Sequence, residues 1–131
     1  MSAVDEVDEL IEQCHLAQGE VAKGNPEPVK RLFSHRKDVT LNNPFVPPVR
    51  GWERVAEVTD RAVAQFRDGE MVSYEIIERH VTPELAYVVG IERGKAKMGG
   101  SENSAPIALR ATMTFALKWA PGRWCIGTQT P

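Results

Sequence analysis

The second half of the chain reads as a continuous series of β-strands. Residues 71–81, 85–93, 107–119 and 123–130 are rich in β-branched and aromatic side chains. Turn residues separate these segments at Thr82-Pro83, within 94–106 and at Pro121-Gly122. Because short turns join antiparallel neighbours, the sequence predicts an antiparallel meander in which each strand pairs with the next.

Helical periodicity is confined to the first half. Apolar residues recur at helical spacing over 2–21 and 52–66, with Ser2 and Gly24 bounding the first helix and Gly69 closing the second. A short helix after Pro26, a brief strand over 38–42 and a proline-rich loop lie between them. This order predicts one α+β domain over 1–131, with three N-terminal helices covering the apolar face of a curved sheet.

Strand alternation assigns side chains to the two faces of that sheet. Two-residue turns at 82–83 and 121–122 would place Glu92 and Arg110 together on the milder outer face. A β-bulge would reverse this assignment, so whether Glu92 and Arg110 face the pocket or a dimer interface is left open. Ile77, Val88, Ala108 and Thr112 share that face, which predicts a homodimer formed partly through it. The covered, apolar face would contain Tyr74, Ile76, Tyr87, Val89, Ile91, Leu109, Met113, Phe115, Leu117, Trp119, Trp124 and Ile126.

Charge, hydropathy and cysteine spacing argue against several classes of partner and site. The chain has 16 basic and 18 acidic residues without a basic stripe, so we expect no nucleic-acid partner. It has neither a long apolar run nor a secretory signal, so we expect no membrane association and a cytoplasmic location. Cys14 and Cys125 lack metal-ligand spacing with any His, and we expect no metal and no cofactor.

Several short phrases occur in order at 24–33, 38–44, 50–55, 84–87 and 109–112, followed by Gly122-Arg-Trp124. Together with the order of elements, they resemble the SnoaL-like, nuclear transport factor 2-like superfamily, which includes ketosteroid isomerases and polyketide cyclases. The resemblance covers nearly the whole chain and implies a cystatin-like cone. In that superfamily the helices and the concave face of the sheet enclose an apolar pocket, which we therefore expect here.

The catalytic groups that the resemblance implies are missing. Asn43 occupies the position of the general-base carboxylate of ketosteroid isomerases, and Ala17 lies near that of their oxyanion tyrosine. Residues 105–131 contain no Asp or Glu, which also leaves Arg110 without the carboxylates of an epoxide hydrolase site. Thr128 and Thr130 stand where many relatives carry histidines, and hydroxyls are poor bases. Whether the chain is an enzyme is left open.

The sequence predicts one mainly apolar ligand pocket with few neutral polar groups. Its ligand would be small, uncharged, and aromatic or alicyclic, with isomerase-, cyclase- or dehydratase-like chemistry possible. The alternative is a non-catalytic, dimeric protein-interaction module. We interpret His15, His35 and His80 as surface or edge residues. The predicted pocket residues are Asn43, Phe45, Trp52, Tyr74, Met113, Phe115, Thr128 and Thr130.

Overall fold

The computed structural model describes residues 2–42, 47–117 and 123–130, the last range by its backbone alone. This part of the chain confirms the α+β class. No helix within it is long and apolar enough to cross a membrane. Its elements are α1 (Ala3–Ala22), α2 (Glu27–Leu32), β1 (Thr40–Asn42), β2 (Val49–Arg50), α3 (Trp52–Val63), β3 (Phe66–Val81), β4 (Leu85–Met98), β5 (Ser104–Ala116) and β6 (Arg123–Thr130).

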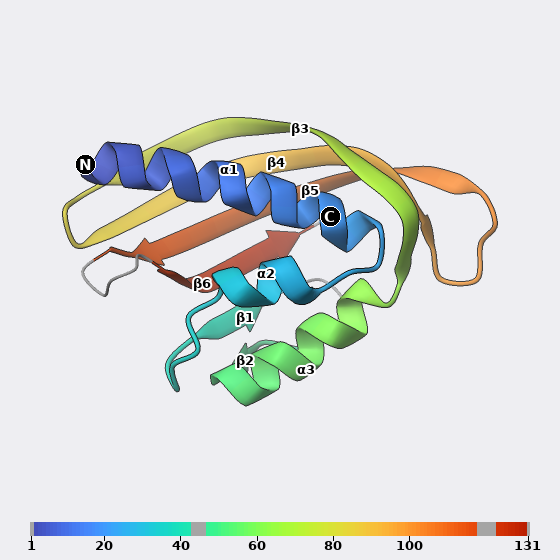
Figure 1. Cartoon of the computed structure of the whole chain (residues 1–131), viewed down its shortest axis with the longest axis horizontal. Helices are drawn as coiled ribbons and strands as arrows, with labels where there is room; N and C mark the ends of the chain where they lie inside the picture. The colour runs from blue at the N-terminus through green and yellow to red at the C-terminus, as the bar shows by residue number, and fades with distance from the viewer. Residues whose placement is uncertain (1, 43–46, 118–122, 131) are drawn as a thin grey trace.

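The strands form one curved sheet in the order β2-β1-β6-β5-β4-β3. Neighbours from β3 to β6 are antiparallel, as the meander predicted, and β1 joins β6 in parallel. Helix α1 lies along the long strands, while α2 and α3 lie toward β1 and β2 (Figure 1). The sheet and helices therefore enclose a core on one face only, which is the cystatin-like arrangement.

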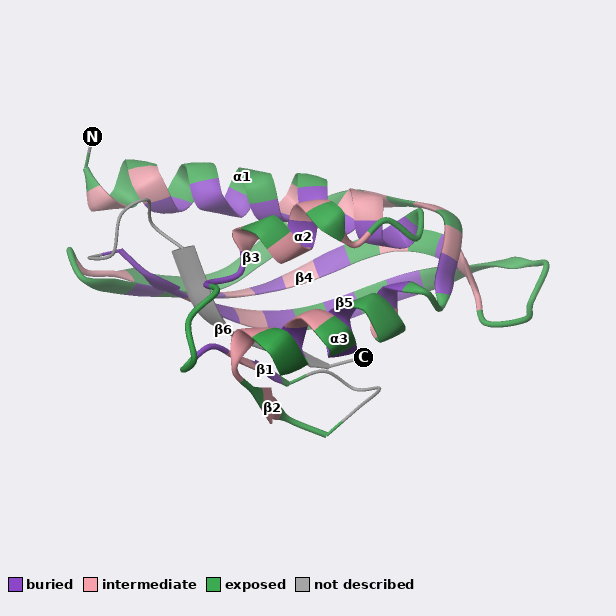
Figure 2. Cartoon of the chain, turned by 60° about the horizontal axis from the view of Figure 1, so that its bottom comes forward, coloured by how far each residue is buried: buried purple, intermediate pink, exposed green. Residues whose placement is uncertain are grey.

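Helix α1 begins and ends as its sequence predicts. The Ser2 hydroxyl accepts a hydrogen bond from the Asp5 amide at 3.2 Å, and Gly24, with φ of 90°, follows the last turn. Its buried side faces the sheet and its exposed side faces away (Figure 2). The buried residues of α1 are Val7, Leu10, Ile11, Cys14, Ala17, Gln18, Val21 and Ala22.

The boundary between α3 and β3 differs from the prediction. The helix ends at Val63 and Phe66 already begins β3, so Gly69 is a strand residue and does not close the helix. A Cβ at Gly69 would lie 2.4 Å from the Lys95 carbonyl oxygen and 2.8 Å from that of Ala22. The missing side chain therefore lets β3 approach β4 and α1 closely at a register shift.

The β3–β4 register reverses the predicted faces of β4. Val81 pairs with Ala86, so the turn is two residues longer than expected, which leaves the predicted faces unchanged. The register shift between Ile76 and Glu78 then places Tyr74 opposite Glu92. Changing the register by one residue turns every side chain to the opposite face. Glu92 and Val88 are therefore buried on the concave face, and their predicted outer position is wrong. Tyr87, predicted to face inward, is exposed.

Strand β5 has the predicted orientation, whereas its pairing with β6 differs. Leu109, Met113 and Phe115 are buried on the concave face, and Arg110 is exposed. A two-residue turn at 121–122 would place Phe115 opposite Thr128. Phe115 instead pairs with Trp124, and Thr128 pairs with Thr112, with a register shift between Thr114 and Phe115.

Candidate functional site

A buried carboxyl on the concave face is the center of the candidate site. Glu92, on β4, is only 4% exposed. Its Oε2 lies 2.8 Å from Nδ1 of His15 on α1, a hydrogen-bond distance. The His15 side chain remains 24% exposed, so solvent reaches the imidazole. His15 is therefore a partner of a buried acid, and its interpretation as a simple surface or edge residue is wrong.

The His15–Glu92 pair holds a proton that can move near neutral pH. Burial disfavours the charged carboxylate and raises the pKa of Glu92 to about 7, although the hydrogen bond and charge of His15 act in the opposite direction. A group that exchanges its proton near the working pH can act efficiently as a general acid or base. The pair is thus suited to proton transfer.

Tyr74 brings a hydroxyl to the same cluster from β3. Its ring stacks against the His15 imidazole with centroids 6.4 Å apart. The hydroxyl is buried and has no hydrogen-bond partner within the described part of the protein. Burial, and then the Glu92 charge, raise the pKa of Tyr74, so the phenol stays protonated and able to donate.

Gly90 makes room for this phenol. A Cβ at position 90 would lie 2.3 Å from both Cζ and the hydroxyl oxygen of Tyr74. The ring of Tyr74 therefore lies directly over the β4 backbone. Strand pairing places Tyr74 opposite Glu92 and Ile76 opposite Gly90, so the phenol reaches diagonally over the glycine two residues before Glu92.

Cys14 borders the cluster without contributing a nucleophile. It is buried on α1, and burial followed by the Glu92 charge raises its pKa to about 12. At neutral pH it is an uncharged thiol. Among the described residues, no group of three or more His, Cys, Asp and Glu side chains could hold a metal ion.

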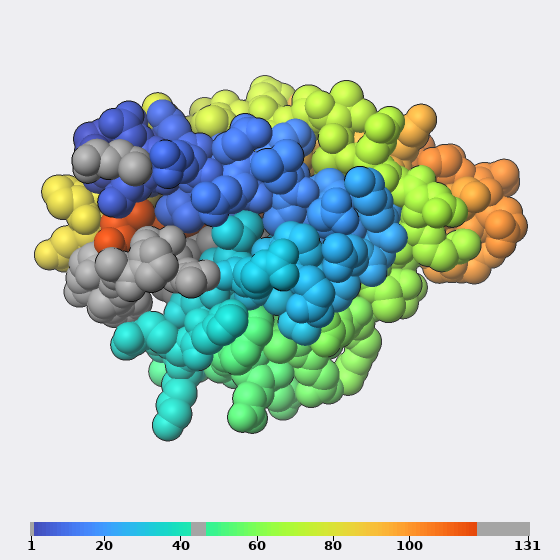
Figure 3. All heavy atoms as spheres, viewed as in Figure 1, coloured from blue at the N-terminus to red at the C-terminus, as the bar shows by residue number. Residues whose placement is uncertain are grey.

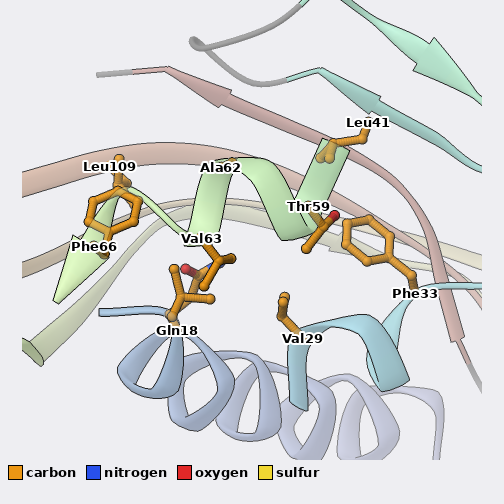
Figure 4. A pocket seen from close by; sticks show the side chains of 10 residues that line it. Gln18, Val29, Phe33, Leu41, Thr59, Ala62, Val63, Phe66 and Leu109 are labelled. Atoms are coloured by element: carbon orange, nitrogen blue, oxygen red, sulfur yellow. The ribbon is translucent and has the colours of Figure 1, made fainter. Parts of the chain in front are cut away.

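A small apolar cavity lies on the same side of the sheet, between the helices and β5 (Figure 4). Its volume is about 40 Å³. Within the part of the chain that the structure describes, its polar lining side chains are Gln18 and Thr59, both neutral and buried. The Thr59 hydroxyl has no hydrogen-bond partner in the part of the chain described here. The lining residues are Gln18, Val21, Val29, Phe33, Leu41, Thr59, Ala62, Val63, Phe66 and Leu109.

The cavity lies next to the acid–base cluster both on α1 and on the sheet. Gln18 follows Cys14 by one helical turn of α1, and both are buried. On the sheet, the cavity residue Leu109 pairs directly with Glu92. The two features therefore belong to neighbouring parts of one concave surface.

The predicted pocket residues are distributed over several places. Tyr74 belongs to the acid–base cluster, Met113 and Phe115 are core residues, and Trp52 stacks on His35 at the start of α3. None of these four lines the cavity. Asn43 and Phe45 lie outside the described residues, and so do the side chains of Thr128 and Thr130. A single pocket formed by the whole set stays a prediction.

Sequence reasoning did not assign to the site four polar residues that the structure places on the concave side. Gln18 and Thr59 each interrupt an otherwise apolar helical stripe, which is a signal that the sequence carries. His15 lies beside such a stripe and Glu92 alternates with apolar residues along β4. The face of Glu92 relative to Tyr74 depends on the register shift between Ile76 and Glu78, which uninterrupted strand alternation does not predict.

Comparisons with known proteins identify the fold of the chain and do not identify an activity. No protein-family model and no curated protein matches the chain. Among solved structures, a nuclear transport factor 2-like superfamily protein from Salmonella enterica is similar with a TM-score of 0.75 and 17% identity, covering 95% of this chain and 87% of the other.

Two further solved structures show the same fold. A ketosteroid isomerase-like protein from Erwinia carotovora atroseptica has a TM-score of 0.69 and 17% identity, covering 98% of this chain and 92% of the other. An NTF2-like protein with a cystatin-like fold from Novosphingobium aromaticivorans has a TM-score of 0.65 and 17% identity, covering 98% and 80%. The chain thus has the NTF2-like, cystatin-like fold that its sequence predicted.

Proposed function

We propose that this protein binds a small, uncharged cyclic ligand inside the cone and moves a proton on it with the His15–Glu92 pair. The observation that carries the proposal is the buried Glu92 carboxyl, held 2.8 Å from an imidazole on the concave face. A buried acid with a strongly raised pKa is costly to stability and marks candidate functional sites.

The cavity favours a neutral ligand. No charged residue is among the described residues that line it, and Gln18 and Thr59 offer an amide and a hydroxyl. A cavity that holds benzene has roughly 150 Å³, so a volume of about 40 Å³ is too small for a ring. Ligand entry therefore requires wall side chains such as Phe33 and Phe66 to move.

The chemistry that fits these groups is proton transfer next to a carbonyl. The pair removes a proton from the carbon beside the carbonyl, and the electron pair of the broken C–H bond forms an enolate. Tyr74 donates a hydrogen bond to the enolate oxygen, and the proton returns to the same or another carbon. Return to another carbon isomerises the ligand, return to the same carbon only exchanges its proton, and neither route involves oxidation or reduction. Tyr74 thereby supplies from β3 the donor that ketosteroid isomerases carry on the first helix.

Hydrogen exchange into model ketones tests this proposal and does not require the natural ligand. The protein is incubated in D2O with a set of uncharged cyclic ketones, and loss of the C–H signal next to the carbonyl is followed by NMR. We expect saturable exchange by the native protein and a loss of about 100-fold or more in Glu92→Gln, because general-base catalysis contributes at least that factor. Glu12→Gln, on the exposed side of α1, is the matched control.

A second pair of variants separates binding from chemistry. Thr59→Val removes the unpartnered hydroxyl and should weaken ketone binding several-fold, because losing one hydrogen bond costs about 1 kcal/mol of binding free energy. The rate of hydrogen exchange at saturating ketone should stay the same. Tyr74→Phe should lower the exchange rate at saturation. Exchange equal in the native protein and Glu92→Gln would refute proton transfer, and absence of ketone binding would refute the ligand site.

The outer face of the sheet favours a second candidate function, assembly with another copy of this chain. Ile77, Leu85 and Tyr87 are 55%, 49% and 40% exposed near the β3–β4 turn. Ala108, also part of the predicted interface, is exposed on β5. Val88 does not contribute, because it is buried on the concave face. We propose a homodimer through this face, since apolar side chains grouped on a sheet favour association.

Sedimentation velocity at micromolar concentration tests the dimer. We expect the native protein to sediment as a dimer and Ile77→Asp to sediment as a monomer, because a charge would lose its hydration at the interface. Leu16→Asp is the control, since Leu16 is an equally exposed apolar residue on α1. A monomeric native protein, or dissociation of the Leu16 variant alone, would contradict the proposal.

A further inference from the structure

A second concavity, separate from the cone, lies where the segment after α2 meets the start of α3. Its volume is about 450 Å³. The two segments that form it lie beside each other at the lower edge of the molecule (Figure 3). The Gly51 amide donates a 2.7 Å hydrogen bond to the Val39 carbonyl, which joins them. The lining residues are His35, Arg36, Lys37, Arg50, Gly51, Trp52, Glu53 and Arg54. We call this the basic groove.

Aromatic packing fixes one wall of the basic groove. The His35 ring stacks on the Trp52 indole with centroids 3.8 Å apart and planes at 16°. His35 Nε2 also donates a 3.0 Å hydrogen bond to the Lys30 carbonyl. Trp52 further contacts Phe33, a buried residue of the core, at 6.5 Å between centroids. The wall is thus held in place before any ligand arrives.

The charge in the groove is strongly unbalanced. Lys37, Arg50 and Arg54 form no ion pair with any carboxylate in the described part of the protein. Arg36 pairs with Asp38 at 3.4 Å, and Glu53 is the acid that lines the groove. The whole chain carries a net charge of −2, so this excess of positive charge is local.

Backbone donors add to these cations. Helix α3 has Gly51 at its N-cap position, and no side chain there accepts a hydrogen bond from the first turn. The first amides of a helix have no acceptor within the helix, and they lie at the positive end of its dipole. The amides of Trp52, Glu53 and Arg54 therefore add to the positive field of the three cations.

We propose that the basic groove binds a phosphate monoester or diphosphate group of a small molecule or lipid headgroup. Phosphate oxygens accept several charge-assisted hydrogen bonds at once, and clustered guanidinium, ammonium and backbone amides supply the donors. The groove also has the volume of an ordinary small-molecule site. This anion site is independent of the cone and of the chemistry proposed there.

NMR titration with pyrophosphate tests the groove. We expect saturable shifts of the amide signals of residues 52–54 and of the Trp52 indole, and none with sodium chloride at matched ionic strength. The double variant Lys37→Gln/Arg54→Gln should raise the dissociation constant about tenfold or more, because it loses two charge-assisted contacts. Arg61→Gln/Lys95→Gln removes the same charge away from the groove and should leave the dissociation constant unchanged.

Flotation with vesicles identifies the source of the phosphate. Binding to phosphatidylcholine vesicles only when they contain phosphatidic acid, and its loss in Lys37→Gln/Arg54→Gln, would assign a lipid headgroup. Pyrophosphate binding without vesicle binding would assign a soluble ligand. Equal shifts with chloride and pyrophosphate, or equal weakening by the control double variant, would overturn the site.

Discussion

Replacing Phe115 with Ala should lower the free energy of unfolding by about 3–5 kcal/mol, the usual cost of deleting a buried Phe ring. Phe115 is 0% exposed and lies on the concave face of β5 within the core. The residue opposite it on β4 is Ala86, whose small side chain cannot fill the space left by the ring. Urea denaturation followed by circular dichroism measures the change.

Tyr87→Ala provides the control for this substitution. Tyr87 is an aromatic residue of the neighbouring strand, but it is 40% exposed on the outer face. Its truncation should cost clearly less, on the order of 1 kcal/mol. Equal losses in the two variants, or a loss in Phe115→Ala below that of Tyr87→Ala, would show that the concave face is not the core of the protein.

The second large effect is a pH dependence of stability caused by Glu92. Its pKa rises from the ordinary value of 4.5 to about 7 in the folded protein. Between these pH values the unfolded chain releases a proton that the folded chain keeps, so the free energy of unfolding falls as pH rises. The total loss is about 3 kcal/mol, because each pKa unit corresponds to roughly 1.4 kcal/mol.

Glu92→Gln isolates this effect from the other carboxyls. As the pH rises from 4.5 to about 7, the difference in unfolding free energy between the native protein and this variant should decrease by about 3 kcal/mol. Above that range the difference should stay constant. Glu75→Gln, at an exposed residue paired with Arg93, should show no comparable trend. A difference between native protein and Glu92→Gln that does not change with pH would show that the carboxylate is well solvated.

The same carboxyl connects stability with the proposed chemistry. A buried acid that is destabilising near neutral pH would not be needed for packing, since a neutral amide of the same shape fills the space. If Glu92→Gln is more stable and loses hydrogen exchange, the carboxyl serves proton transfer at a cost in stability. If Glu92→Gln is more stable and keeps hydrogen exchange, the His15–Glu92 pair has another role.

The elements of this fold were predictable from local patterns. Ser2 and Gly24 bound α1 as the capping rules require, because each satisfies backbone groups within a few residues along the chain. The β-rich second half produced the meander, since short connections leave successive strands few other partners. The resemblance to NTF2-like proteins predicted the cone that the solved structures share.

The candidate site was not predictable in the same way, because it depends on register and on contacts between distant segments. Uninterrupted alternation from the turn at 82–83 placed Glu92 on the face opposite Tyr74, whereas the register shift between Ile76 and Glu78 brings both residues to the same face. A shift of one residue is enough, since strand side chains alternate between faces. No local pattern records where a strand shifts its register by one residue.

The sequence by itself determined the type and order of the helices and strands except β2, which lies at the end of the segment predicted as a proline-rich loop. It also determined the apolar stripes that form the core and the absence of the usual ketosteroid isomerase residues. The tertiary structure alone decided that His15 meets Glu92 and Tyr74, and that Lys37 joins Arg50 and Arg54 in one groove. Capping, propensity and periodicity act over a few residues, whereas these groups are brought together only when the helices pack against the sheet.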